Sequence, residues 1–233
     1  MSETLRVSET FGPTIQGEGP SAGRHAYFVR LWGCNLDCAW CDTPYTWDTT
    51  GKNGRAYERD KESRLVEIDT LAQIAAQRSL LTVITGGEPL IQRAGLARLA
   101  YLLLEEFERD VEIETNGTLR PLDVAGIRYN VSPKLLGAHV TSTKALDLDT
   151  LSQYVELDSI FKFVISDRKD FAQVEALVAA LHLDASRVWV MPQSRSAEEV
   201  IAGAQSIVSY ALEARFNLSL RSHVLLWNNE RER

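Results

Sequence analysis

Cysteine and long apolar runs are both scarce in this chain of 233 residues. The only cysteines are Cys34, Cys38 and Cys41, and their close spacing would strain most disulfide geometries. Apolar runs such as residues 99–104 are far shorter than a bilayer-crossing helix, so no membrane association is predicted. Residues 2–9 are polar and mixed, unlike a secretory signal, which predicts a cytoplasmic protein with reduced thiols.

An excess of positive charge is also lacking. The chain has 25 basic and 32 acidic residues and a net charge of −7. This balance argues against a nucleic-acid partner, including a tRNA, because nucleic-acid-binding proteins normally carry a basic patch. Hydrophobic residues make up 45% of the chain, which is enough to bury a substantial core in one large α/β domain or two small ones.

The three cysteines form the pattern C-x3-C-x2-C. Three thiolates can hold three corners of a [4Fe–4S] cluster and leave one iron without a protein ligand. Such an open iron predicts chemistry with a small molecule. A structural zinc site is an alternative if His25 or His139 supplies a fourth ligand, although neither stands at zinc-finger spacing. Thiols without a metal are a third reading.

Strand-like and helix-like patterns alternate along the chain. Strands are predicted at 26–32, 82–85, 111–115, 129–132, 161–166 and 188–191, and a final extended segment at 218–227. Helices are predicted at 68–78, 94–109, 148–155, 171–181 and 200–211, and an exposed polar excursion at 49–64. This alternation predicts an α/β fold with a parallel sheet and crossover helices, either open or curled into a barrel.

Unusual residues follow five of the predicted strands. They are the cysteine loop, Gly86–Pro89, Asn116-Gly117, Ser132–Lys134 and Met191–Gln193. The carboxyl ends of parallel strands share one edge of a sheet, where ligands bind in such folds. The sequence therefore predicts a ligand site on this edge.

The cysteine pattern with Trp40 before its last cysteine, together with Gly86-Gly87-Glu88-Pro89, resembles the radical S-adenosylmethionine (SAM) superfamily. The runs Phe11–Gly19, Phe28-Val29-Arg30, Cys41-Asp42-Thr43 and Ser132-Pro133-Lys134 resemble the 7-carboxy-7-deazaguanine synthase family, and the similarity covers nearly the whole chain. The resemblance implies a partial (β/α)6 barrel, irregular around 49–64. It also implies one radical SAM domain over 1–233, with an N-terminal substrate-binding segment (about 1–25) and a C-terminal extension (about 217–233).

This resemblance also implies an activity. Members are lyases that convert 6-carboxy-5,6,7,8-tetrahydropterin to 7-carboxy-7-deazaguanine and ammonia, on the way to deazapurines such as queuosine. A 5′-deoxyadenosyl radical abstracts hydrogen, so no protein side chain is assigned as catalytic. The implied cofactors are a [4Fe–4S] cluster with three cysteine ligands, SAM and Mg²⁺. The implied partners are an electron donor such as flavodoxin or ferredoxin and a second copy in a homodimer.

Site residues follow from the matching motif positions. The cluster ligands are Cys34, Cys38 and Cys41, and Thr43 is the Mg²⁺ position. The substrate set is Ile15, Gln16, Gly17, Glu18, Arg30 and Thr85. The SAM set is Trp40, Cys41, Asp42, Gly87, Glu88, Asn116, Ser132, Pro133, Lys134 and Gln193.

Two of these side chains can also be interpreted directly. Arg30 lies inside an apolar strand, where a charge is costly unless it is paired. It could hold a substrate carboxylate bidentately, or form a structural ion pair with a neighbouring strand. Glu18 could accept two N–H bonds from an aminopyrimidinone edge. His223, in the C-terminal region, is given no role.

Two other functions remain open. A small radical SAM activase that takes hydrogen from a partner protein would share the cluster but needs a broad open face. A non-catalytic zinc-binding module would use the cysteine loop only structurally.

Overall fold

The strands of the protein form a single sheet in the order β3-β1-β2-β4-β5-β6-β7-β8-β9. The structure is a computed structural model that describes residues 3–141, 145–228 and 230–232. The extreme ends of the expected N-terminal segment and C-terminal extension (positions 1–2, 229 and 233) therefore lie outside the described residues. The strands are β1 (Thr4–Ile15), β2 (His25–Leu31), β3 (Arg64–Glu67), β4 (Leu81–Gly86), β5 (Asp110–Thr115), β6 (Arg128–Val131), β7 (Ile160–Ile165), β8 (Val188–Pro192) and β9 (Asn217–Leu218).

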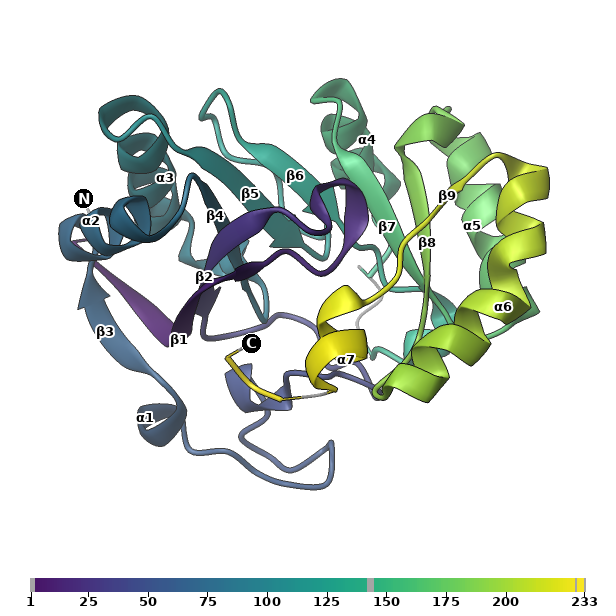
Figure 1. Cartoon of the computed structure of the whole chain (residues 1–233), viewed down its shortest axis with the longest axis horizontal. Coiled ribbons are helices and arrows are strands. Elements are labelled where there is room, and N and C mark those ends of the chain that lie inside the picture. Colours follow the sequence, from purple (N-terminus) through teal and green to yellow (C-terminus); the bar gives the residue numbers. More distant parts are fainter. Residues whose placement is uncertain (1–2, 142–144, 229, 233) are drawn as a thin grey trace.

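The sheet from β2 through β4, β5, β6, β7 and β8 is parallel throughout, and the short β9 continues it in the same direction. Strands β1 and β3 add an antiparallel extension at the β2 edge. Six parallel strands in an open, curved sheet confirm the predicted partial barrel (Figure 1).

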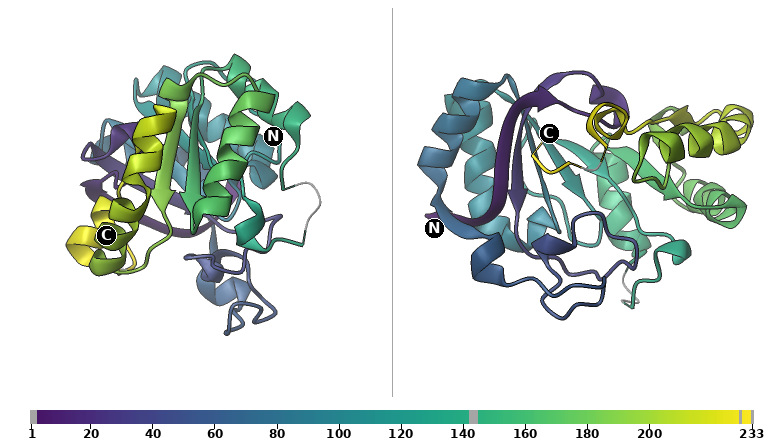
Figure 2. Two further views of the ribbon diagram at one scale, coloured as in Figure 1. Left: turned by 90° about the vertical axis from the view of Figure 1, so that its right-hand side faces the viewer. Right: turned by 60° about the horizontal axis from the view of Figure 1, so that its bottom comes forward.

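The helices are α1 (Arg59–Glu62), α2 (Ile68–Arg78), α3 (Arg93–Tyr101), α4 (Leu148–Glu156), α5 (Arg168–Ala180), α6 (Ala197–Ala214) and α7 (Ser222–Trp227), and a π-helical turn at Leu102–Glu106 continues α3. Helices α2 to α6 cover the outer face of this sheet, whereas α1 lies in the excursion after the cysteine loop and α7 lies at a cavity that opens at the carboxyl ends of the strands. Helices α2 and α3 lie toward one end of the sheet and α5 and α6 toward the other (Figures 1 and 2). The crossover from β5 to β6, residues 116–127, contains no helix. No helix among the described residues is long and apolar enough to cross a membrane.

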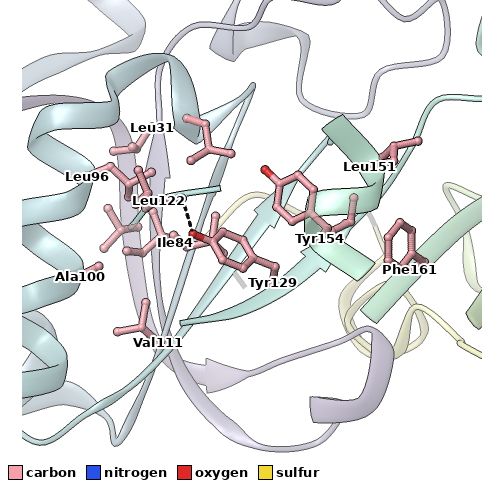
Figure 3. Close-up of a cluster of buried hydrophobic side chains, with 14 of the residues drawn as sticks. Leu31, Ile84, Leu96, Ala100, Val111, Leu122, Tyr129, Leu151, Tyr154 and Phe161 are labelled. Atoms are coloured by element: carbon pink, nitrogen blue, oxygen red, sulfur yellow. Dashed lines mark hydrogen bonds between the residues drawn. The ribbon is translucent and has the colours of Figure 1, made fainter. Parts of the chain in front are cut away.

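Each parallel strand divides its side chains between two layers because successive residues point to opposite faces. In β7, Phe161 and Phe163 pack into the core under the helices, whereas Lys162 and Val164 face the concave side. Figure 3 shows the helix-side core, in which Tyr129 accepts a hydrogen bond from the Leu122 amide at 2.9 Å. The concave side is apolar at its base, where the stacked rings of Phe11 and Phe28 lie 4.8 Å apart.

One local prediction is wrong, one gains detail and one strand was overlooked. The segment 218–227 is not extended: after Leu218 it turns into α7, whose Val224 is fully buried. A six-residue apolar run has no period that separates strand from helix. The 49–64 excursion contains the short helix α1 and leads into β3. Strand β1 was not predicted from residues 2–9, although Leu5, Val7, Glu9 and Phe11 are buried in strict alternation.

Candidate active site

A cavity opens at the carboxyl ends of the parallel strands, bounded by the cysteine loop, the 15–18 segment and α7. It is open to solvent at its mouth and is lined by apolar, polar and charged side chains, as ligand sites commonly are. The predicted site residues all line it except Glu88 and Pro133. Those that line it are Ile15, Gln16, Gly17, Glu18, Arg30, Cys34, Cys38, Trp40, Cys41, Asp42, Thr43, Thr85, Gly87, Asn116, Ser132, Lys134 and Gln193.

The cysteine loop follows β2, and its three sulfurs face this cavity as free thiols. Burial raises the pKa of the Cys34 thiol to about 12. Backbone and indole N–H groups point at two of the sulfurs: Leu36 N donates to Cys34 Sγ at 3.4 Å, and Trp47 Nε1 donates to Cys41 Sγ at 3.3 Å. Such donors stabilise the thiolate form that an iron–sulfur cluster requires. The donor set therefore fits a cluster with three protein ligands.

The zinc alternative finds no support in the position of the histidines. His25 contacts Ser79 Oγ at 3.0 Å, at the start of β2, and His139 does not line the cavity. Among the described residues, no three His, Cys, Asp or Glu side chains are grouped closely enough for a single metal ion. A cluster binds each thiolate on a different iron, so its ligands are spaced more widely than those of one ion.

The Gly86–Pro89 turn packs directly against the cysteine loop. Glu88 N donates to Gly33 O at 2.8 Å, and a Cβ on Gly87 would overlap Gly33 and Cys34. Only glycine allows this approach. The Glu88 side chain points away from the cavity and is completely buried, where it accepts bonds from Thr115 Oγ1 (2.9 Å) and Asn116 N (2.7 Å). Its burial raises its pKa, and its carboxylate joins the ends of β4 and β5.

Glu18 stands at the centre of a charged network in the cavity wall. Its Oε2 is paired with Lys162 Nζ from β7, and its Oε1 accepts from Arg221 Nε at 2.9 Å. Although burial opposes ionisation, these two cations hold the pKa of Glu18 far below its usual value. Glu18 is therefore an ionised carboxylate with lone pairs left for a ligand.

Arg221 connects three parts of the chain. Besides Glu18, it donates to Asp42 Oδ2 at 2.5 Å and to Ser194 O at 2.6 Å. The α7 segment is anchored further by Ser222, whose N and Oγ both donate to Gly17 O at 2.9 Å. A side chain on Gly17 would overlap the His223 ring. The C-terminal segment is thus part of the cavity wall.

Arg30 forms the structural ion pair that one interpretation expected. Its Nε donates to Glu9 Oε1 at 2.7 Å, from the paired position on β1, and Tyr45 Oη donates to the same oxygen at 2.7 Å. Within the described residues, however, the two terminal nitrogens of Arg30 have no hydrogen-bond partner. Arg30 also lines the cavity, so both of its interpretations are geometrically possible.

The remaining predicted side chains occupy the rim nearest the cysteine loop. Trp40 Nε1 donates to Gly137 O at 3.0 Å, which fixes its ring beside the cavity. Asn116 Nδ2 donates to Asn35 Oδ1 at 2.9 Å, and Lys134 Nζ to Ser132 Oγ at 2.9 Å. Gln193 Oε1 accepts from Ser166 Oγ at 3.1 Å. Thr43 Oγ1 lies 3.8 Å from Cys41 Sγ.

Sequence reasoning missed several cavity residues. Lys162 lies in the apolar run Phe161–Ser166, and a charge inside an apolar strand, the signal used for Arg30, would have identified it. Glu114 likewise alternates with apolar residues in β5, and Gln16 Nε2 donates to it at 3.3 Å. Arg195 and Arg221 carry no local signal, because they reach the cavity from loops.

Comparison with known proteins agrees with this geometry. Residues 32–182 match the radical SAM superfamily. The chain is 36% identical over 231 residues to a 7-carboxy-7-deazaguanine synthase of Pyrobaculum aerophilum, covering 97% of this chain and 96% of that protein. It is 35% identical to the synthase of Hyperthermus butylicus, covering 97% and 94%, and 30% identical to that of Escherichia coli, covering 94% and 97%.

A solved structure matches as well. The crystal structure of QueE from Escherichia coli superimposes with a TM-score of 0.68 at 27% identity, covering 93% of each chain. Membership of the radical SAM superfamily implies a [4Fe–4S] cluster and SAM as cofactors, in agreement with the three thiols and their N–H donors. The chain belongs to the 7-carboxy-7-deazaguanine synthase family of radical SAM enzymes.

Proposed function

We propose that this protein converts 6-carboxy-5,6,7,8-tetrahydropterin into 7-carboxy-7-deazaguanine and ammonia. The names of its relatives support the reaction. One observation carries the proposal: the cavity that the three thiols line also holds a carboxylate, Glu18, and a guanidinium, Arg30. An ionised Glu18 suits the N–H donors of an aminopyrimidinone, and the partner-free end of Arg30 suits a carboxylate.

Cys34, Cys38 and Cys41 would hold the cluster, with its fourth iron open to SAM. When bound, the cluster and SAM would supply the one-electron and hydrogen-abstraction chemistry of the reaction. The chain's own residues would bind and orient SAM and the substrate, and would exclude water from them. Gly87, Trp40 and Asn116, which line the cavity, would contact SAM.

The binding of the substrate depends on preformed side chains. Lys162 and Arg221 keep Glu18 charged and oriented, so that it binds without rearrangement. Gln16 and the backbone at Gly17 border the same space, and Thr85 lies across it at the end of β4. We infer that Mg²⁺ binds near Thr43. One hydroxyl oxygen is a weak ligand, so water and the substrate carboxylate must complete the octahedron.

The same proposal covers the setting of the enzyme. It acts as one radical SAM domain in the cytoplasm, forms a homodimer and takes its electron from a small redox protein. The radical SAM activase is less favoured, because Glu18, Arg30 and Lys162 place charged groups inside a cavity suited to a small anionic ring, whereas a protein substrate needs a broad open face.

The test is an anaerobic incubation of the reconstituted protein with SAM, dithionite, Mg²⁺ and the carboxypterin. The expected result is 7-carboxy-7-deazaguanine, detected by mass, with SAM not consumed in proportion. A conservative variant, Glu18→Gln, should raise the KM for the pterin at least tenfold, because it removes a charge from two hydrogen bonds. SAM cleavage without the deazaguanine product would refute the proposal.

A further inference from the structure

A second hollow lies beside the cysteine loop, separate from the cavity described above. Three distant parts of the chain form it: the 39–57 region, the loop after β8 and the C-terminal residues. Figures 1 and 2 show the 47–58 segment protruding from the body of the molecule, and its residues Lys52, Asn53 and Tyr57 share the hollow with Arg231. The hollow is lined by Ala39, Cys41, Asp42, Pro44, Tyr45, Lys52, Asn53, Tyr57, Arg195 and Arg231.

The charge of this hollow differs from that of the chain. Against a net charge of −7, its lining holds three cations, Lys52, Arg195 and Arg231, and one carboxylate, Asp42. Asp42 is already paired with Arg221. A further cation, Arg55, lies over the Tyr57 ring at 5.1 Å.

Some of these cations are partly neutralised by neighbours. Lys52 is paired with Asp37, and Arg231 contacts Glu9 at 3.2 Å and Glu62 at 3.3 Å. Within the described residues, Arg55 and Arg195 have no carboxylate at ion-pair distance. Among the described residues that line the hollow, Arg195 is therefore the guanidinium without a carboxylate partner, and Arg55, beside the lining residue Tyr57, adds a second one at the rim. Cations outnumber carboxylates in this part of the surface.

The wall between the two cavities is the cysteine loop itself. Cys41, Asp42 and Arg195 line both of them, and Arg195 Nη2 donates to Cys41 O at 3.4 Å. A molecule seated in the hollow would reach a predicted cluster ligand without entering the space for SAM and substrate. The hollow thus gives separate access to the redox centre.

We propose that this hollow is the docking surface for an acidic one-electron carrier protein. The proposal rests on the proposed function, which requires such an electron. On docking, the reduced carrier would lose one electron, and the iron–sulfur cluster that the three cysteines would hold would gain it. No bond forms or breaks in either protein. Arginine and tyrosine side chains are enriched at protein interfaces, and here they are Arg55, Arg195, Arg231 and Tyr57. Complementary charge between the two proteins would speed their encounter.

The test compares two double variants of equal charge change. Lys52→Gln with Arg55→Glu alters the rim of the hollow and leaves every residue that lines the first cavity in place. Because Lys52 pairs with Asp37 of the cysteine loop, the iron content of the reconstituted variant is first shown to equal that of the unaltered protein. Arg78→Gln with Arg215→Glu is the control: these exposed cations precede β4 and β9, at the opposite edge of the sheet. Binding of oxidised flavodoxin to the reconstituted holoenzyme is measured by calorimetry at low and high salt, and turnover is measured with dithionite and with reduced flavodoxin.

The rim variant should bind flavodoxin about tenfold more weakly at low salt, with a smaller difference at high salt. Its flavodoxin-driven turnover should fall in parallel, its dithionite-driven turnover should be unchanged, and the control should match the unaltered protein. Equal binding by both variants would overturn the proposal, as would strong binding of inorganic phosphate or a tRNA transcript in place of flavodoxin. If the double variant does not fold, Arg55→Gln alone is compared with Arg78→Gln. Lack of deazaguanine product with dithionite would refute only the proposed reaction, because the calorimetry still decides docking.

Discussion

Arg221 shows how much of the site depends on one residue that no local pattern marks. Its guanidinium bonds Glu18, Asp42 and Ser194 O, so it joins the N-terminal segment, the cysteine loop and the loop after β8. Buried charges of this kind are costly to break one partner at a time, because the other partner is left without compensation.

Arg221→Gln should therefore reduce kcat/KM for the pterin at least tenfold, chiefly through KM. It should lower the free energy of unfolding by about 2–3 kcal/mol, since Asp42 is partly exposed and recovers some solvation. Steady-state kinetics and urea unfolding measure the two effects. The control Arg98→Gln, which breaks the exposed pair with Asp69, should change stability by less than about 1 kcal/mol. Equal losses in both variants would argue against a special role of Arg221.

Charged side chains inside apolar strands also mark this site. Arg30 and Lys162 both lie in such runs, and both line the cavity. The cost of burying a charge makes this pattern informative. It does not reveal the partner: Arg30 pairs with Glu9 and Lys162 with Glu18, each from another strand or segment.

Among the elements, the excursion after the cysteine loop is held by one carboxylate. Asp48 Oδ1 accepts from Gly51 N at 2.8 Å and Lys52 N at 3.1 Å, and Oδ2 accepts from Asn53 N at 2.7 Å. These amide donors lower the pKa of Asp48. Asn53 Nδ2 in turn donates to Cys38 O at 3.2 Å, so the excursion supports the cysteine loop.

Asp48→Ala should release this segment. We expect faster tryptic cleavage after Lys52 and Arg55, a loss of stability of about 1–2 kcal/mol, and less iron bound after reconstitution. Proteolysis followed by mass spectrometry and iron analysis are the measurements. The control Asp184→Ala removes a comparable acceptor of Ser186 N, at 2.8 Å, before β8. If cleavage at 52 and 55 is no faster in Asp48→Ala than in this control, the carboxylate does not hold the excursion.

Element boundaries followed the hydrophobic period where it was long enough. Helices α2, α5 and α6 and strands β4, β5, β7 and β8 lie where their periods predicted them. The period failed for α7, whose six residues cannot show a repeat, and β1 was overlooked because its polar face obscured the alternation. Strand β1 carries Glu9, the ion-pair partner of Arg30 on β2, so overlooking β1 also hid this pair.

For the molecule as a whole, folding stability should depend on pH near neutrality through His223. Burial lowers the pKa of this imidazole below its ordinary 6.5, opposed in part by Glu18, whose Oε1 lies 3.9 Å away. In the window below pH 6.5 the unfolded chain binds the proton more readily than the folded one. Stability should therefore rise with pH up to about 6.5 and level off above it.

The measurement is urea unfolding of the reconstituted protein between pH 5.5 and 7.5. His223→Asn should flatten the dependence by about 1.4 kcal/mol for each unit by which the pKa is lowered. The exposed His182, in a left-handed conformation that asparagine tolerates, provides the control His182→Asn, which should keep the original slope. An unchanged slope in His223→Asn would show that the imidazole does not titrate with folding.

The sequence by itself determined the local parts of this protein. The strand and helix periods, the cysteine spacing and the glycine turn each depend on neighbours in the chain. Together they indicated a parallel α/β sheet, a cysteine loop able to hold a cluster and the edge where ligands bind, and the family resemblance added the partial barrel. Only the tertiary structure decided which charges meet. Lys162 lies 144 positions after Glu18 in the chain, and Arg221 lies 203 positions after it. Ion pairing depends on distance in space, which no local pattern encodes.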